Sequence, residues 1–159
     1  MNDKKIHIYN LLQEVCNIAT NQLNTTPIVY GSIGVELILN KDFDASDIDI
    51  ILKDEIYFQK EKLDEVMIQN GYQLLDMPYH SYIKEGISIE FANFNYWQQT
   101  CQFINADFIS VQQYNHLYVV LPLENQIKLY EYLTKHPTRS KLKKARDQLK
   151  LEALKHFKR

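Results

Sequence analysis

Two aspartates separated by one residue, Asp47 and Asp49, are the side chains whose spacing most directly suggests chemistry. They open the run 47–52, Asp-Ile-Asp-Ile-Ile-Leu, whose alternation of acidic and apolar residues predicts a strand. Successive side chains of a strand point to opposite faces, so both carboxylates lie on one face, roughly 7 Å apart along the backbone. Such a pair can converge on one or two divalent cations.

A third acid stands in a second alternating run. Residues 87–91 read Ile-Ser-Ile-Glu-Phe, which predicts a strand with its apolar side chains toward the core and Glu90 on the opposite face. If this strand lies beside residues 47–52, the three carboxylates are about one strand spacing, near 5 Å, apart. That arrangement would complete a metal site. Taken singly, each acid also fits the simpler interpretation of a solvated strand residue.

A short turn precedes the acid pair in the sequence. Residues 28–30 predict a strand, Gly31 and Ser32 a tight turn, and residues 33–39 a short apolar helix. The first backbone N–H groups of a helix have no partner within the helix, and they favour an anion. We therefore expect Gly31 and Ser32 to hold the phosphates of a nucleotide.

Gly31-Ser32, a short helix and an Asp-x-Asp strand in this order resemble the signature of the nucleotidyltransferase superfamily, which includes DNA polymerase beta. The run 31–39 is most similar to the group that adenylylates lincosamide and aminoglycoside antibiotics, where a Gly-Gly-aromatic-Gly/Ala-hydrophobic-Asp pattern is usual. This chain departs from that pattern at Ser32, Ile33 and Glu36. It also has Ala-Ser at 45–46, where a basic residue or histidine often precedes the acids.

The resemblance assigns two further residues. The third carboxylate of the superfamily lies on a strand in a hydrophobic-acid-hydrophobic setting, which corresponds to Glu90. In the antibiotic-modifying relatives a late Arg/Lys-Asp segment opens the last helix, and residues 143–147 resemble it. Lys144 is accordingly the candidate cation for the nucleotide phosphates.

The implied function is a Mg²⁺-dependent nucleotidyl transfer, with one or two metal ions held by Asp47, Asp49 and Glu90 and with Glu90 on the acceptor side. A triphosphate can approach three carboxylates only with a cation between them. The expected reaction moves a nucleoside monophosphate, AMP from ATP, to a hydroxyl of a small molecule, by analogy an antibiotic. Two alternatives stay open: a minimal nucleotidyltransferase that modifies a protein partner, as in toxin and antitoxin pairs, and a catalytically silent nucleotide-binding scaffold.

Composition sets limits on these hypotheses. The chain has 159 residues, 45% of them hydrophobic, which suits one domain spanning residues 1–159. A formal net charge of -2 argues against a nucleic-acid partner. The sequence shows neither an apolar signal region nor a membrane-length apolar run, so a cytoplasmic protein is expected. Cys16 and Cys101 lack the spacing of a disulfide framework or a zinc site. A homodimer is an open alternative.

The fold class expected is α/β (α+β), with a mixed, partly antiparallel sheet covered by helices on one side. Helical periodicity favours helices at 5–23, 55–70, 123–136 and 140–157. Strands are expected at 28–30, 47–52, 72–75, 79–84 and 87–91, with a turn at 76–78. Residues 107–111 and 117–121 fit two strands or one strand and a loop, and residues 93–106 have no clear assignment.

The final helix, 140–157, is strongly basic. Nine of the chain's 18 lysines and arginines lie between residues 139 and 159. A solvated amphipathic face is the favoured interpretation over a ligand site, because Leu142, Ala145, Leu149 and Ala153 provide an apolar side for packing.

Overall fold

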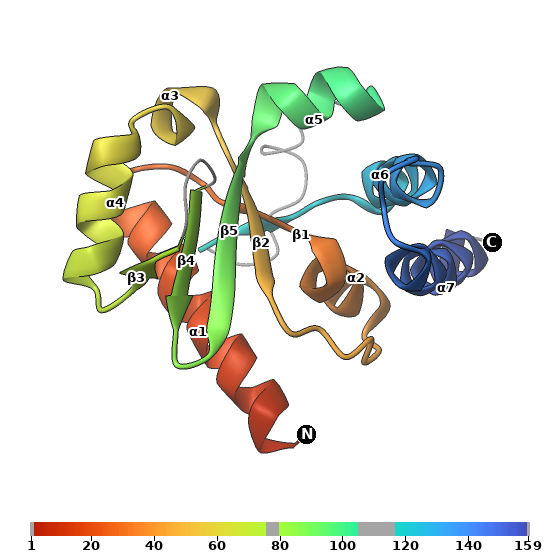
Figure 1. Ribbon diagram of the computed structural model, residues 1–159, viewed down its shortest axis with the longest axis horizontal. Coiled ribbons are helices and arrows are strands. Elements are labelled where there is room, and N and C mark those ends of the chain that lie inside the picture. Colours follow the sequence, from red (N-terminus) through yellow and green to blue (C-terminus); the bar gives the residue numbers. More distant parts are fainter. Residues whose placement is uncertain (1, 76–79, 105–116, 159) are drawn as a thin grey trace.

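A mixed sheet of six strands forms the centre of the computed structural model, which describes residues 2–75, 80–104 and 117–158 (Figure 1). The strands lie in the order β3-β4-β5-β2-β1-β6. Their bounds are β1 Ile28–Tyr30, β2 Ile48–Leu52, β3 Gln73–Leu74, β4 His80–Lys84, β5 Ile87–Asn93 and β6 Val119–Val120. The helices are α1 Asp3–Asn21, α2 Gly31–Leu39, α3 Asp54–Tyr57, α4 Lys60–Gln69, α5 Phe94–Cys101, α6 Leu123–Thr134 and α7 Lys141–Lys158.

The sheet contains both parallel and antiparallel strand pairs. β2 pairs in parallel with β5 and antiparallel with β1, while β1 pairs in parallel with β6. β4 joins β5 through the two-residue turn Glu85-Gly86, where both residues have positive φ, as a tight hairpin requires. The expected fold class, a mixed and partly antiparallel sheet with helices packed on it, is confirmed.

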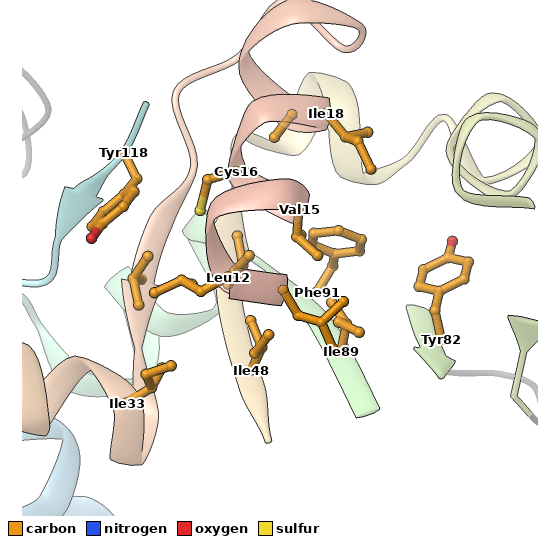
Figure 2. Packing of buried hydrophobic residues seen from close by; sticks show 14 of the residues in the cluster. Leu12, Val15, Cys16, Ile18, Ile33, Ile48, Tyr82, Ile89, Phe91 and Tyr118 are labelled. Atoms are coloured by element: carbon orange, nitrogen blue, oxygen red, sulfur yellow. The ribbon is translucent and has the colours of Figure 1, made fainter. Parts of the chain in front are cut away.

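Helices cover both faces of the sheet, so the expectation of helices on one side is wrong. Ile48 and Ile50 of β2 belong to a core shared with α1, and Figure 2 shows Leu12 and Val15 of α1 beside this surface. Ile51 belongs to a second core that includes buried residues of α6 and α7. The reason is the composition of β2, whose last three residues are apolar and therefore require cover on both sides.

The helix expected at 55–70 is two helices, α3 and α4, separated by Phe58 and Gln59. The Phe58 side chain is 68% exposed, so no buried face continues through this point. The Asp54 carboxylate accepts a hydrogen bond from the Asn95 backbone N–H at 3.0 Å, which ties the short α3 to α5. Helical spacing from Leu63 onward predicted α4, but it did not define where that helix begins.

The region left unassigned at 93–106 contains α5. Residues 107–111 and the turn at 76–78 lie outside the described residues. Residues 117–121 contain the short strand β6. Across the described ranges, every helix is too short or too polar to cross a membrane.

The packing face of α7 differs from the expected one. Leu142 and Leu149 are 63% and 64% exposed. The buried side chains of this helix are instead Asp147, Lys150, Leu151 and Leu154. The last two pack in the second core, with α6. The rotation of α7 therefore turns two charged residues inward.

Candidate active site

The sheet register brings two of the predicted acids together. Asp49 of β2 lies directly opposite Glu90 of the parallel strand β5, and Tyr30 of β1 lies opposite Asp49 on the other side. Residues paired in this way point to the same face of the sheet. Asp47, two residues before Asp49, lines the same cavity as Asp49 and Glu90. The expectation that residues 87–91 pair beside the Asp-x-Asp strand is confirmed.

These carboxylates stand in an unfavourable electrostatic environment. Burial, reinforced by the charges of Glu90 and Asp47, raises the pKa of Asp49 to about 7. Burial and the charge of Asp47 also raise the pKa of Glu90. Carboxylates that repel one another in this way form the oxygen-rich donor set that Mg²⁺ prefers.

The arrangement of these carboxylates does not form a complete set of metal ligands. Within residues 2–75, 80–104 and 117–158, no group of three or more histidine, cysteine, aspartate or glutamate side chains is arranged to hold a metal ion. The three-carboxylate metal site therefore stays a prediction. The residues fit the ion in donor type and charge.

Gly31 allows the close approach of α2 to Asp49. Its φ of +71° is strained for any residue with a side chain, and a Cβ placed there would lie 2.2 Å from Asp49 Oδ2. The chain passes from the extended Tyr30 directly into α2 at this point. The start of the helix, where the first backbone N–H groups have no partner within the helix, therefore lies against Asp49.

A cavity of about 740 Å³ joins the acidic residues of the sheet to the basic residues of α7. Gly31, Ser32 and the three predicted acids contribute to its walls. Its basic residues include Lys4, Arg139, Lys143, Arg146 and Lys150. The cavity is therefore lined by both signs of charge, and α7 contributes Asp147 as well as its basic residues.

Lys144, the candidate phosphate-binding cation, is not among the residues that line this cavity, and its role stays a prediction. Residues 143, 147 and 150 follow the spacing of one helix face, whereas residue 144 is rotated away from it by about 100°. The inward face of α7 therefore supplies Lys143 and Lys150 to the cavity. The basic run at residues 143–147 indicated which segment contributes to the cavity, but it did not indicate which of its lysines does so.

Lys150 is an unusual lysine, because its side chain is buried, at 8% exposure, without a close anionic partner. Among the described residues no carboxylate lies within ion-pair distance of its ammonium group, which instead stands 5.8 Å from the Tyr130 ring centroid. The nearby Asp147 carboxylate is engaged by the Arg139 guanidinium, one of whose contacts measures 3.2 Å. Burial lowers the pKa of Lys150.

Tyr130 links the basic helix to the predicted turn. Burial raises the pKa of its phenol, and the Ser32 side chain contacts the hydroxyl. Tyr130 and Ser32 both line the cavity. Its place in an amphipathic helix was the one feature of Tyr130 that the sequence pattern offered.

Glu36 organises the connection that leads to the acid pair, a role that sequence reasoning missed. Its buried carboxylate accepts hydrogen bonds from Lys5 Nζ at 2.8 Å and from the backbone N–H groups of Phe43 and Ala45 at 2.9 Å. Tyr9 donates a further one at 3.1 Å. An acid within an otherwise apolar helix was the available signal. Glu36 therefore fixes the backbone just before Asp47.

Comparisons with known proteins place the fold. No protein-family model matches the chain. An uncharacterized protein, YnaI of Bacillus subtilis (strain 168), is 26% identical over 151 residues, covering 92% of this chain and 95% of its own. The solution structure of the antibiotic-resistance factor ANT(2'')-Ia aligns with a TM-score of 0.53 at 13% identity, over 97% of this chain and 91% of that one. The chain thus has a nucleotidyltransferase-like fold.

Proposed function

We propose that this protein is a Mg²⁺-dependent nucleotidyltransferase that moves AMP from ATP to a hydroxyl group of a small molecule. The observation that carries the proposal is the pairing of Asp49 with Glu90 across two parallel strands, in a cavity that is also lined by basic residues of α7. The similarity of fold to ANT(2'')-Ia supports it independently.

The residues of the cavity divide into two groups by charge. Asp47, Asp49 and Glu90 would hold Mg²⁺, which when bound neutralises the triphosphate and activates its α-phosphorus. The backbone at Gly31 and the Ser32 side chain would bind phosphate oxygens at the start of α2. Lys143, Arg146 and Lys150, which line the cavity, would neutralise the departing pyrophosphate.

Glu90 is the proposed proton acceptor in this reaction. The acceptor oxygen forms a bond to the α-phosphorus, the bond from that phosphorus to pyrophosphate breaks, and the hydroxyl proton passes to a Glu90 carboxylate oxygen. The raised pKa of Glu90 suits this task, because a stronger base accepts the proton more readily. Glu90 lines the cavity, so an acceptor bound there could reach its carboxylate.

The proposed acceptor is a hydroxylated small molecule. The resistance function named for ANT(2'')-Ia makes antibiotics the first compounds to screen. Modification of a protein hydroxyl would use the same donor site, and the experiment below examines the donor site before any acceptor is known.

The test measures binding of a non-hydrolysable ATP analogue by calorimetry, with Mg²⁺ and with EDTA. We expect Mg²⁺-dependent binding by the wild type and its loss in Asp49→Asn and Glu90→Gln. Glu61→Gln, which replaces an exposed acid of α4 outside the cavity, should bind as the wild type does. Binding that is equal in all four proteins would contradict the proposed site. Transfer is then followed with α-labelled ATP and a panel of hydroxylated compounds.

A further inference from the structure

A second hollow adjoins the main cavity. It has a volume of about 470 Å³ and lies between α5 and the turn that joins α6 to α7. Aromatic rings form much of its wall, with centroid separations of 5.2 Å between Tyr96 and Trp97, 6.1 Å between Trp97 and Tyr132, and 5.4 Å between Tyr132 and His136. We call it the aromatic pocket.

The charge of the aromatic pocket is of one sign. Arg139 and Lys143 line it, and none of the described residues lining it is an aspartate or glutamate. A polycationic ligand would therefore meet repulsion here without compensation. A planar ring that bears a negatively charged group matches both the aromatic wall and the cations.

The two hollows adjoin each other. Trp97, Leu133, Arg139 and Lys143 line both of them. A single ligand can therefore place a ring in the aromatic pocket and extend an anionic chain past Arg139 and Lys143 toward Ser32 and the acids. A nucleoside triphosphate has this order of groups.

We propose that the aromatic pocket binds the nucleobase of the donor nucleotide, with Tyr96 and Trp97 supplying the stacking surface. This inference rests on the proposed function, since it concerns the same nucleotide. It also places the acceptor: with the base on the side of α5 and the phosphates along α7, the acceptor enters from the side of Glu90. The pocket consequently selects the donor, and the absence of carboxylates among the described residues of its lining sets it apart from a site for an amine-rich acceptor.

Trp97 provides a direct test, because it is the sole tryptophan of the chain. Its fluorescence is followed during titration with α,β-methylene-ATP and, separately, with inorganic tripolyphosphate, both with Mg²⁺, while calorimetry reports binding. We expect the nucleotide analogue to quench the emission to saturation, and tripolyphosphate to bind without quenching. Stacking of the base on an aromatic ring is responsible for that difference.

The variant Tyr96→Ala removes part of the stacking surface at a position that is already half exposed, so the fold should tolerate it. It should weaken binding of the nucleotide analogue about tenfold, with tripolyphosphate affinity unchanged. The matched control is Phe58→Ala, an exposed aromatic residue outside both hollows, which should alter neither affinity.

The outcomes separate this inference from the proposed function. Binding of the nucleotide analogue without quenching, at an affinity that Tyr96→Ala leaves unchanged, would place the base elsewhere while the donor site stands. Absence of binding by both ligands would overturn the donor site and this inference together.

Discussion

At the scale of single residues, Gly31 and Asp49 depend on each other. We expect Gly31→Ala to destabilise the protein by more than Gly86→Ala, although both glycines have positive φ. The control has open space around its Cα, so it should lose about 1 kcal/mol from backbone strain alone. Gly31→Ala adds the collision with Asp49 Oδ2 and should lose roughly 2 to 4 kcal/mol in total.

Urea unfolding of both variants measures this difference. Binding of Mg²⁺ and ATP should also fail in Gly31→Ala and persist in Gly86→Ala, because the new methyl group displaces the Asp49 carboxylate. Equal losses of stability in the two variants would show that Asp49 moves aside without cost.

The raised pKa of Asp49 predicts that replacing this residue increases the free energy of unfolding by an amount that depends on pH. The folded state has a pKa of about 7 at this carboxyl, against roughly 3.9 for an unfolded chain. The folded protein therefore retains the proton more strongly, and its stability falls as the pH rises from about 4 to about 7. Asparagine has no such titration, so Asp49→Asn should gain more stability at pH 8 than at pH 5.

The increase in the free energy of unfolding of Asp49→Asn should be larger at pH 8 than at pH 5 by on the order of 2 kcal/mol. This is less than the pKa shift alone implies, because Asp49 keeps some contact with solvent. Denaturant unfolding in EDTA at both pH values measures it without interference from metal. A gain of the same size at pH 5 and pH 8 would mean that Asp49 titrates normally in the folded state.

At the scale of elements, α7 turns charged residues inward and leucines outward. A buried ammonium group without a carboxylate partner is costly to the free protein, and an anionic ligand would relieve that cost. We therefore expect Lys150→Met to leave the free energy of unfolding unchanged or to raise it by up to about 1 kcal/mol. The same change should weaken binding of the ATP analogue about tenfold.

Lys144→Met is the matched control for this prediction, because it alters the same helix and the same residue type outside the cavity. It should change neither quantity. Thermal unfolding and calorimetry on the two variants measure both effects. A large loss of stability in Lys150→Met with unchanged nucleotide affinity would assign the lysine a structural role instead.

At the scale of the whole molecule, local pattern predicted the elements well where burial is one-sided. The alternation in residues 87–91 predicted which face of β5 is buried. The spacing of three and four residues between Ile8, Leu11 and Val15 predicted the buried face of α1. The Asp-x-Asp pattern gave the strand and also, through its pairing with residues 87–91, the position of Glu90 beside Asp49.

Long-range packing accounts for what sequence pattern missed. The apolar positions of α7 suggested a face containing Leu142 and Leu149, but α6 fixes the helix through Leu151 and Leu154. The choice of Lys150 over Lys144 follows from that rotation. Glu36 acquires its role from partners 7, 9 and 31 residues away, which no local periodicity identifies.

The division of the cavity between a sheet and a helical layer predicts where a ligand stabilises the molecule. A nucleotide with Mg²⁺ would connect the acids of β2 and β5 to the basic residues of α7, so opening of α7 from the sheet would require loss of the ligand. At a concentration of 100 times its dissociation constant, the ligand adds about 2.7 kcal/mol to the free energy of that opening. Amides that exchange through this opening should slow by about a hundredfold, those of α7 and the start of α2 first.

Hydrogen exchange measured with and without Mg²⁺ and the ATP analogue locates the effect. The α4 helix lies against the other core, which contains its buried Leu63 and Met67, and the exposed amides of its outer face exchange by local fraying that the ligand does not oppose. We therefore expect little added protection in α4 and strong protection in α7. Protection that is greater in α4 than in α7 would place the nucleotide on the opposite face of the sheet, away from Asp49 and Lys150.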